Sequence, residues 1–109
     1  MKICIIGTGY VGLVTGVCFS DLGHNVICTD NNVKKIENLK KGLIPIFEPG
    51  LDELVKKNYK ARRLNFTTDI DYSIKKSNLI FICVGTPTKK KSYSADLSQI
   101  IKVVNIISK

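Results

Sequence analysis

The residues of this chain with the clearest chemical potential are three closely spaced glycines and one acid. Gly7, Gly9 and Gly12 form the pattern Gly-x-Gly-x-x-Gly, and Asp30 follows them. In such a turn the first glycine permits a tight bend, the second lets a pyrophosphate approach the backbone, and the third allows close packing of a helix on a sheet. An acid about 20 residues further on accepts hydrogen bonds from a ribose. Because a carboxylate there repels a ribose 2′-phosphate, the pattern predicts a site for NAD rather than NADP.

This interpretation requires a strand before the glycines, a helix after them and a second strand that ends at the acid. Residues 2–6 predict a strand buried on both faces, because every residue after Lys2 is apolar and most are β-branched. In residues 11–22 apolar positions recur every three or four residues, which predicts an amphipathic helix ended by Gly23. This stripe consists of Val11, Val14, Thr15, Cys18, Phe19 and Leu22. Residues 25–29 predict the second strand, although the glycines could instead only form a turn and Asp30 only cap the next helix.

Further helices and strands alternate along the rest of the chain. Asn31 or Asn32 can cap a helix closed by Gly42, and a loop with two prolines spans 43–50. The other predicted elements are a short helix beginning at Leu51, a strand at 64–68, a helix capped by Asp69, a strand at 79–84 and a helix from Asp96 to Ile107. This alternation predicts an α/β chain with a Rossmann-type doubly wound parallel sheet, truncated after about four strands. Residues 1–109 are thus expected to be the N-terminal part of one NAD-binding domain.

Composition and charge exclude several other classes of function. The chain carries 17 Lys and Arg against 9 Asp and Glu, a net charge of +8. The cations fall in scattered pairs without interleaved aromatic residues, so we expect no binding to nucleic acid. No apolar run is long enough to cross a membrane. The cysteines show no C-x-x-C spacing, so we predict no metal site. We expect them to be reduced residues in the core of a cytoplasmic protein; they are Cys4, Cys18, Cys28 and Cys83.

Several segments carry a resemblance to a known family. They are MKICIIGTGYVG at 1–12, GHNV at 23–26, IPIFEPGL at 44–51, LIFICVGTPT at 79–88 and ADLS at 95–98. With these segments the whole chain resembles the N-terminal NAD-binding domain of the UDP-glucose/GDP-mannose 6-dehydrogenase family. Glu-Pro-Gly-Leu after a proline-containing loop, combined with Gly-Thr-Pro after the last strand, is more specific than the glycines alone. The resemblance is nearer to the members that use UDP-glucose, and those that use GDP-mannose are the rival.

The resemblance implies additional contacts with NAD. Tyr10 and Val11 would lie in the turn that binds the pyrophosphate, Lys35 would approach the adenosine ribose, and Thr86 would face the dinucleotide. The place of Thr86 at the carboxyl end of a strand agrees with this role, because ligands of such sheets bind beyond those ends. Two alternatives stay open, a solvated helix cation for Lys35 and a simple turn at Thr86.

The resemblance also implies an activity that these residues alone would not perform. Such enzymes oxidise UDP-glucose to UDP-glucuronate by passing two hydrides to two NAD molecules, through a thiohemiacetal on a cysteine beyond residue 109. None of the four cysteines here lies in that motif, so no catalytic residue is assigned. His24 is expected to be structural or exposed. Glu48 is expected to fix the 43–50 loop by a hydrogen bond.

The whole enzyme would bind a nucleotide-sugar substrate and form a homo-oligomer, with its substrate-binding and catalytic domains outside these residues. Two other hypotheses remain for the chain itself. It could be a stand-alone NAD-sensing module, which would bind NAD tightly in isolation. It could also be a non-functional remnant that folds poorly, because its last helix would lack the strand on which it packs.

Overall fold

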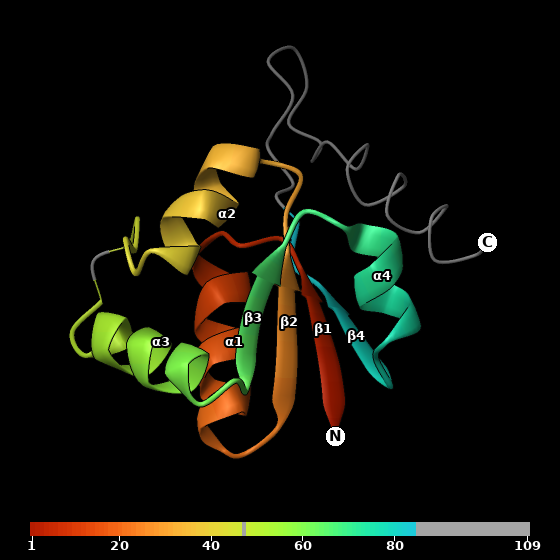
Figure 1. Cartoon of the computed structure of the whole chain (residues 1–109), viewed down its shortest axis with the longest axis horizontal. Helices are drawn as coiled ribbons and strands as arrows, with labels where there is room; N and C mark the ends of the chain where they lie inside the picture. Colours follow the sequence, from red (N-terminus) through yellow and green to blue (C-terminus); the bar gives the residue numbers. More distant parts are fainter. Residues whose placement is uncertain (47, 85–109) are drawn as a thin grey trace, which may run out of the picture.

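The computed structural model describes residues 1–46 and 48–84, which form a four-stranded parallel sheet with helices on both faces (Figure 1). In chain order the elements are β1 (Lys2–Ile6), α1 (Tyr10–Asp21), β2 (Asn25–Thr29), α2 (Val33–Lys40), α3 (Leu51–Lys60), β3 (Leu64–Thr67), α4 (Ile70–Lys75) and β4 (Leu79–Ile82). The strand order is β3-β2-β1-β4. The predicted Rossmann-type α/β fold is thus confirmed. The predictions for 85–109, Thr86 and the helix from Asp96 included, lie outside the described residues.

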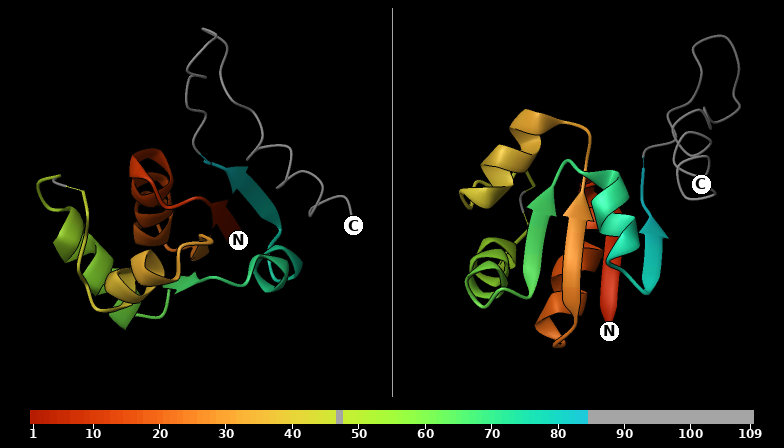
Figure 2. Two further views of the ribbon diagram at one scale, coloured as in Figure 1. Left: turned by 90° about the horizontal axis from the view of Figure 1, so that it is seen from above. Right: turned by 45° about the vertical axis from the view of Figure 1, so that its right-hand side comes forward.

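The direction of each connection explains why helices cover both faces. From β1 to β2 to β3 the chain moves one way across the sheet, and α1, α2 and α3 all lie on one face. After β3 the chain returns to β4 on the far side of β1, and a right-handed crossover in that direction places α4 on the opposite face (Figure 2). β1 is therefore the strand at which the two directions of winding meet.

Two apolar layers hold the sheet between these helices. The larger layer lies under α1, α2 and α3, and its buried members are Ile3, Ile5, Leu13, Val17, Val26, Cys28, Ile36, Leu39, Leu51, Val55, Leu64 and Phe66. On the other face Cys4 and Ile6 are buried, with Ile70 and Ile74 of α4 packed against them. Because both faces of β1 are covered, its sequence is continuously apolar rather than alternating, as predicted.

The buried face of α1 differs in part from the predicted stripe, of which Val14 and Phe19 are partly buried and pack against the larger layer. The buried residues of this helix are Gly12, Leu13, Gly16, Val17 and Ser20. By contrast, Val11 and Leu22 of the stripe are 65% and 76% exposed, and Cys18 is exposed as well. Close packing on the sheet selects small residues, since a Cβ on Gly16 would lie only 2.6 Å from Cys28 Sγ. The prediction that Cys18 is a core residue is therefore wrong.

Helix ends follow the local signals in the sequence more closely than strand ends do. Asn32 caps α2 and Asp69 caps α4, each by accepting a hydrogen bond of 3.0 Å from a backbone N–H of the first turn. Gly23 has the left-handed conformation expected after α1, with φ +103°. The strands β3 and β4 end earlier than predicted, because each ends where the strand beside it ends. The helix α3 is longer than the short helix predicted, because it packs on α1 and β3. The observed ends are Lys60 for α3, Thr67 for β3 and Ile82 for β4.

Candidate functional site

The glycine turn follows β1 at the place where the sheet changes its direction of winding. Ile6, the last residue of β1, pairs with Thr29 on one side and with Ile82 on the other. In open α/β sheets a ligand binds outside the carboxyl ends of the strands at such a switch point. The carboxyl ends of β1, β2 and β4 therefore form the candidate site.

Gly7 and Gly12 are required by the fold itself. Gly7 has φ +102°, and a Cβ there would lie 2.6 Å from the carbonyl oxygen of Cys83, just after β4. Gly12 lies in the first turn of α1, and a Cβ there would collide with the carbonyl oxygen of Gly7. A side chain at either position would push α1 or β4 away from β1. These two glycines hold the turn close to the sheet.

Gly9 has no comparable requirement within the described residues. It is the N-cap residue of α1, with φ −73°, which any residue adopts, and a Cβ there would have no neighbour within 4 Å. Ser, Thr, Asn and Asp stabilise a helix N-cap best, yet α1 has no side-chain cap. The open space at Gly9 adjoins the backbone N–H groups of the first turn of α1, which have no partner within the helix. Such a place suits a phosphate group.

Tyr10 and Val11 begin α1, and their side chains are exposed. The hydroxyl of Tyr10 donates a hydrogen bond to Glu48 Oε2 at 2.7 Å, which confirms the expected role of Glu48 in fixing the 43–50 loop. This bond, together with the negative charge of Glu48, raises the pKa of Tyr10. Tyr10 and Val11 would therefore bind an anion through backbone N–H groups, which have no partner within the helix at its N-terminus.

Asp30 ends β2 and is bound directly to the glycine turn. Its Oδ2 accepts hydrogen bonds from the backbone N–H and the hydroxyl of Thr8, at 3.0 and 2.8 Å, and its Oδ1 accepts one from the N–H of Asn32 at 3.0 Å. Partial burial acts to raise the pKa of Asp30, but these bonds and the nearby charge of Lys35 hold it below the ordinary value. The carboxylate is thus charged at neutral pH. Asn32, not Asp30, caps the next helix.

Lys35 lies in α2 and its ammonium faces Asp30. The distance from Nζ to Asp30 Oδ2 is 3.7 Å, and the Lys35 side chain is 31% exposed. Lys35 is therefore an ion-pair partner of the acid and not only a solvated cation. The sequence analysis missed Thr8, because no spacing rule marks the middle residue of Gly-x-Gly. Its hydrogen bond to Asp30, 22 positions away in the sequence, is visible only in the folded chain.

Three of the cysteines have an environment that disfavours a nucleophilic thiolate, and the described residues contain no candidate set of metal ligands. Burial raises the pKa of Cys4 to about 11, and burial also raises the pKa values of Cys28 and Cys83. His24 lies on the surface, with Nδ1 3.3 Å from the N-terminal ammonium. In residues 1–46 and 48–84 no group of three or more His, Cys, Asp or Glu could hold a metal ion, and no helix there could span a membrane.

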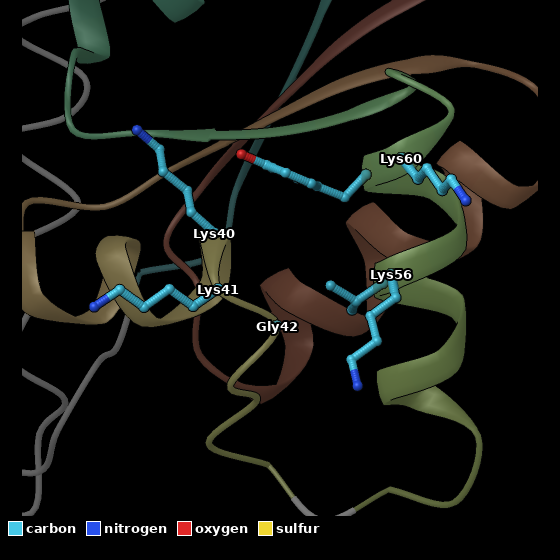
Figure 3. A pocket seen from close by; sticks show the side chains of 7 residues that line it. Lys40, Lys41, Gly42, Lys56 and Lys60 are labelled. Atoms are coloured by element: carbon cyan, nitrogen blue, oxygen red, sulfur yellow. The ribbon is translucent and has the colours of Figure 1, made fainter.

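Away from the glycine turn, a cationic cleft lies between the end of α2 and α3 (Figure 3). Its volume is about 240 Å³ and its lining residues are Lys40, Lys41, Gly42, Val55, Lys56, Tyr59 and Lys60. The lysine side chains point in different directions rather than toward one point (Figure 3). Lysines at the carboxyl ends of helices also stabilise the helix dipole. We therefore assign no ligand to this cleft.

Together, the parallel sheet and the glycine turn at its switch point define a dinucleotide-binding domain of the Rossmann type. Comparison with known families makes this more specific, since residues 1–109 match the NAD binding domain of the UDP-glucose/GDP-mannose dehydrogenase family. The chain belongs to this family, and NAD is the cofactor of the domain.

Individual relatives agree with this assignment. The UDP-glucose 6-dehydrogenase of Rhizobium meliloti (strain 1021) is 56% identical over 100 residues, which are 92% of this chain and 23% of that protein. UDP-glucose 6-dehydrogenase YwqF of Bacillus subtilis (strain 168) is 50% identical over 109 residues, 100% of this chain and 24% of that protein. A crystal structure of the GDP-mannose dehydrogenase of Pseudomonas aeruginosa has a TM-score of 0.93 at 43% identity, covering 98% of this chain and 24% of that one. The chain thus spans about a quarter of the length of these relatives.

Proposed function

We propose that this chain is the NAD-binding domain of an enzyme that oxidises UDP-glucose to UDP-glucuronate with two NAD molecules. Membership of the family supports the cofactor, and the two curated relatives, both named UDP-glucose 6-dehydrogenase, support the substrate. The observation that carries the site is Gly9, whose missing side chain no described neighbour requires. A pyrophosphate that approaches the backbone at position 9 would explain the glycine, because a Cβ there would block it.

In this proposal each residue of the site has a separate task. The turn from Gly7 to Gly12, with Tyr10 and Val11 at the start of α1, holds the pyrophosphate through backbone N–H groups. Asp30 accepts a hydrogen bond from the adenosine ribose, and Lys35 approaches the same ribose beside it. We also assign to Thr86, which follows β4 in the sequence and lies outside the described residues, a contact with the dinucleotide. When bound, NAD accepts the hydride.

The chain's own residues bind and orient the cofactor and do not carry out the oxidation. The buried thiols Cys4 and Cys28 have raised pKa values, which disfavour the thiolate needed for a nucleophile. The catalytic cysteine and the nucleotide-sugar site would therefore lie in the part of the relatives that this chain does not span. We expect the isolated chain to be inactive, and the whole enzyme to be a homo-oligomer.

GDP-mannose is the second candidate substrate. The observation in its favour is the TM-score of 0.93 with the GDP-mannose dehydrogenase of Pseudomonas aeruginosa. We favour UDP-glucose, because the identity of this chain to that protein is 43%, against 56% and 50% for the two UDP-glucose 6-dehydrogenases. A stand-alone NAD-sensing module, which would be a binding protein and not part of an enzyme, is the other alternative. The titration below tests it.

The first test is a calorimetric titration of the 109-residue chain with NAD and with NADP. We expect NADP to bind at least about tenfold more weakly than NAD, because the charged Asp30 repels a 2′-phosphate. Gly9→Ser is the matched variant, since serine is a good N-cap residue and should leave the thermal unfolding temperature unchanged or slightly raised. Its side chain would nevertheless fill the space of the phosphate and weaken NAD binding by about tenfold or more.

Three outcomes of this titration are decisive. Weaker binding of NAD by Asp30→Ala and by Gly9→Ser, with both variants folded, would support the site. A Gly9→Ser variant that binds NAD as tightly as the unchanged chain would contradict it. No heat from a chain shown to be folded would rule out both NAD binding by these residues alone and the NAD-sensing module.

A further inference from the structure

Thr8 is a buried polar residue at the centre of the glycine turn, between Gly7 and Gly9. Both of its donors, the backbone N–H and the hydroxyl, bind the same atom, Oδ2 of Asp30, at 3.0 and 2.8 Å. Any residue except proline would supply the N–H at position 8, but the second bond needs a side-chain hydroxyl. The hydroxyl is therefore the specific contribution of this residue.

The two bonds from Thr8 decide which part of the carboxylate stays available. An ionised carboxylate has two oxygens and about four acceptor positions. Oδ2 accepts two bonds from Thr8 and lies 3.7 Å from the ammonium of Lys35, whereas Oδ1 accepts a single bond from Asn32. Oδ1 is thus the oxygen with the free acceptor position, on a side chain that is 15% exposed.

We propose that Thr8 is a positioning residue for the ribose of the cofactor: its hydroxyl holds Oδ2 of Asp30, so that Oδ1 is presented to a ribose hydroxyl. This inference rests on the proposed function, in which NAD binds at the glycine turn. Thr8 thereby joins the backbone that binds the phosphates to the acid that binds the ribose. The two halves of the adenosine site then have one fixed geometry before the cofactor arrives, which lowers the entropic cost of binding.

The test uses two substitutions at position 8, one of which removes the hydroxyl and the other the methyl group. Thr8→Val keeps the shape and the backbone bond and removes the hydroxyl, whereas Thr8→Ser keeps the hydroxyl. We expect Thr8→Val to weaken NAD binding by about three- to tenfold and Thr8→Ser to bind within about twofold of the unchanged chain. In an Asp30→Ala background, Thr8→Val should have no further effect on NAD affinity, because the hydroxyl acts only through that carboxylate. Should Thr8→Val fail to fold, Thr8→Ala takes its place.

A second measurement is independent of the cofactor. Carbon NMR of the Asp30 carboxyl group should show a higher pKa in Thr8→Val than in the unchanged chain, because a hydrogen bond to the charged form is lost. If the unchanged chain binds NAD and Thr8→Val binds it equally well, the inference is overturned and the proposed function stands. If the folded unchanged chain binds no NAD, the proposed function of these residues is overturned, and this inference with it.

Discussion

At the scale of single residues, glycines of one motif are present for different physical reasons. Gly7 needs a positive φ and a close approach to the backbone after β4, and Gly12 needs to approach Gly7. Gly9 needs neither, and its missing side chain is explained only by something outside the described protein atoms. Asp30 likewise has two roles, because it ties the turn to β2 and still keeps an acceptor position free. Asp30, which is proposed to bind the ribose, is thus also a structural residue.

The lowered pKa of Asp30 predicts a loss of stability in acid. A carboxyl group whose pKa is lower in the folded than in the unfolded state stabilises the fold fully above the unfolded value, about 3.9. This contribution disappears as the pH falls through the lower folded pKa. We therefore expect Asp30→Asn to be less stable than the unchanged chain at pH 7, with the difference shrinking below about pH 4. Urea unfolding at several pH values measures the free energy of unfolding.

Asp71→Asn is the control for this experiment, because Asp71 is an exposed acid in the first turn of α4. Its substitution should change the free energy of unfolding by no more than about 0.5 kcal/mol at any of these pH values. A difference between Asp30→Asn and the unchanged chain that stays constant down to pH 2 would contradict the link between stability and the charge of Asp30.

At the scale of elements, the way α1 packs on the sheet sets the geometry of the site. The helix lies against β1 and β2 through a buried face that contains two glycines and a serine, Gly12, Gly16 and Ser20. These small residues let the backbone of α1 approach the sheet closely. The N-terminus of α1 is thereby held next to the carboxyl end of β1, where a phosphate would need its N–H groups.

Gly16→Ala should therefore destabilise the fold although alanine is the better helix former. The new Cβ would lie 2.6 Å from Cys28 Sγ, and overpacking of this kind outweighs the gain of about 1 kcal/mol in helix propensity. We expect a net loss of about 1–2 kcal/mol in the free energy of unfolding, measured with urea. The double variant Gly16→Ala with Cys28→Ala should regain stability relative to Gly16→Ala, because the sulfur is removed. A single variant at least as stable as the unchanged chain would contradict this packing argument.

At the scale of the whole molecule, the described residues form the cofactor-binding part of the proposed enzyme. The sheet is covered on both faces, and the glycine turn at its switch point leaves the carboxyl edge of the strands for a ligand. The chain corresponds to about a quarter of the length of the relatives it matches. In the proposed function, substrate binding and oxidation therefore depend on residues outside the chain. The proposed function needs a test in which the rest of such an enzyme is supplied.

A chimeric enzyme supplies it. We expect Bacillus subtilis YwqF, with its matching N-terminal quarter replaced by residues 1–109, to form UDP-glucuronate from UDP-glucose and NAD. Its kcat/KM should lie within about tenfold of that of YwqF, because the transferred residues bind the cofactor and do not perform the chemistry. The same chimera with Gly9→Ser is the control, which should fold and assemble but oxidise UDP-glucose at least about tenfold more slowly. A folded chimera that binds NAD without oxidising UDP-glucose would contradict the proposed role of residues 1–109 as the cofactor domain of such an enzyme.

The sequence by itself determined the features that depend on neighbouring residues. The glycine pattern, Asp30 at the end of a strand, the caps Asn32 and Asp69 and the alternation of strands and helices were all predictable, because each signal lies within a few residues of the structure it forms. The alternation of strands and helices also predicted a parallel sheet, since short helical crossovers allow few other arrangements.

Only the tertiary structure decided which face of α1 is buried and which partners the polar side chains take. The predicted apolar stripe was wrong at Val11, Cys18 and Leu22, because periodicity counts apolar residues, whereas close packing on the sheet selected the small ones around Gly16. The hydrogen bond from Thr8 to Asp30 spans 22 positions, and that from Tyr10 to Glu48 spans 38. No local pattern encodes such contacts, because they form only when the sheet brings the ends of different strands and loops together.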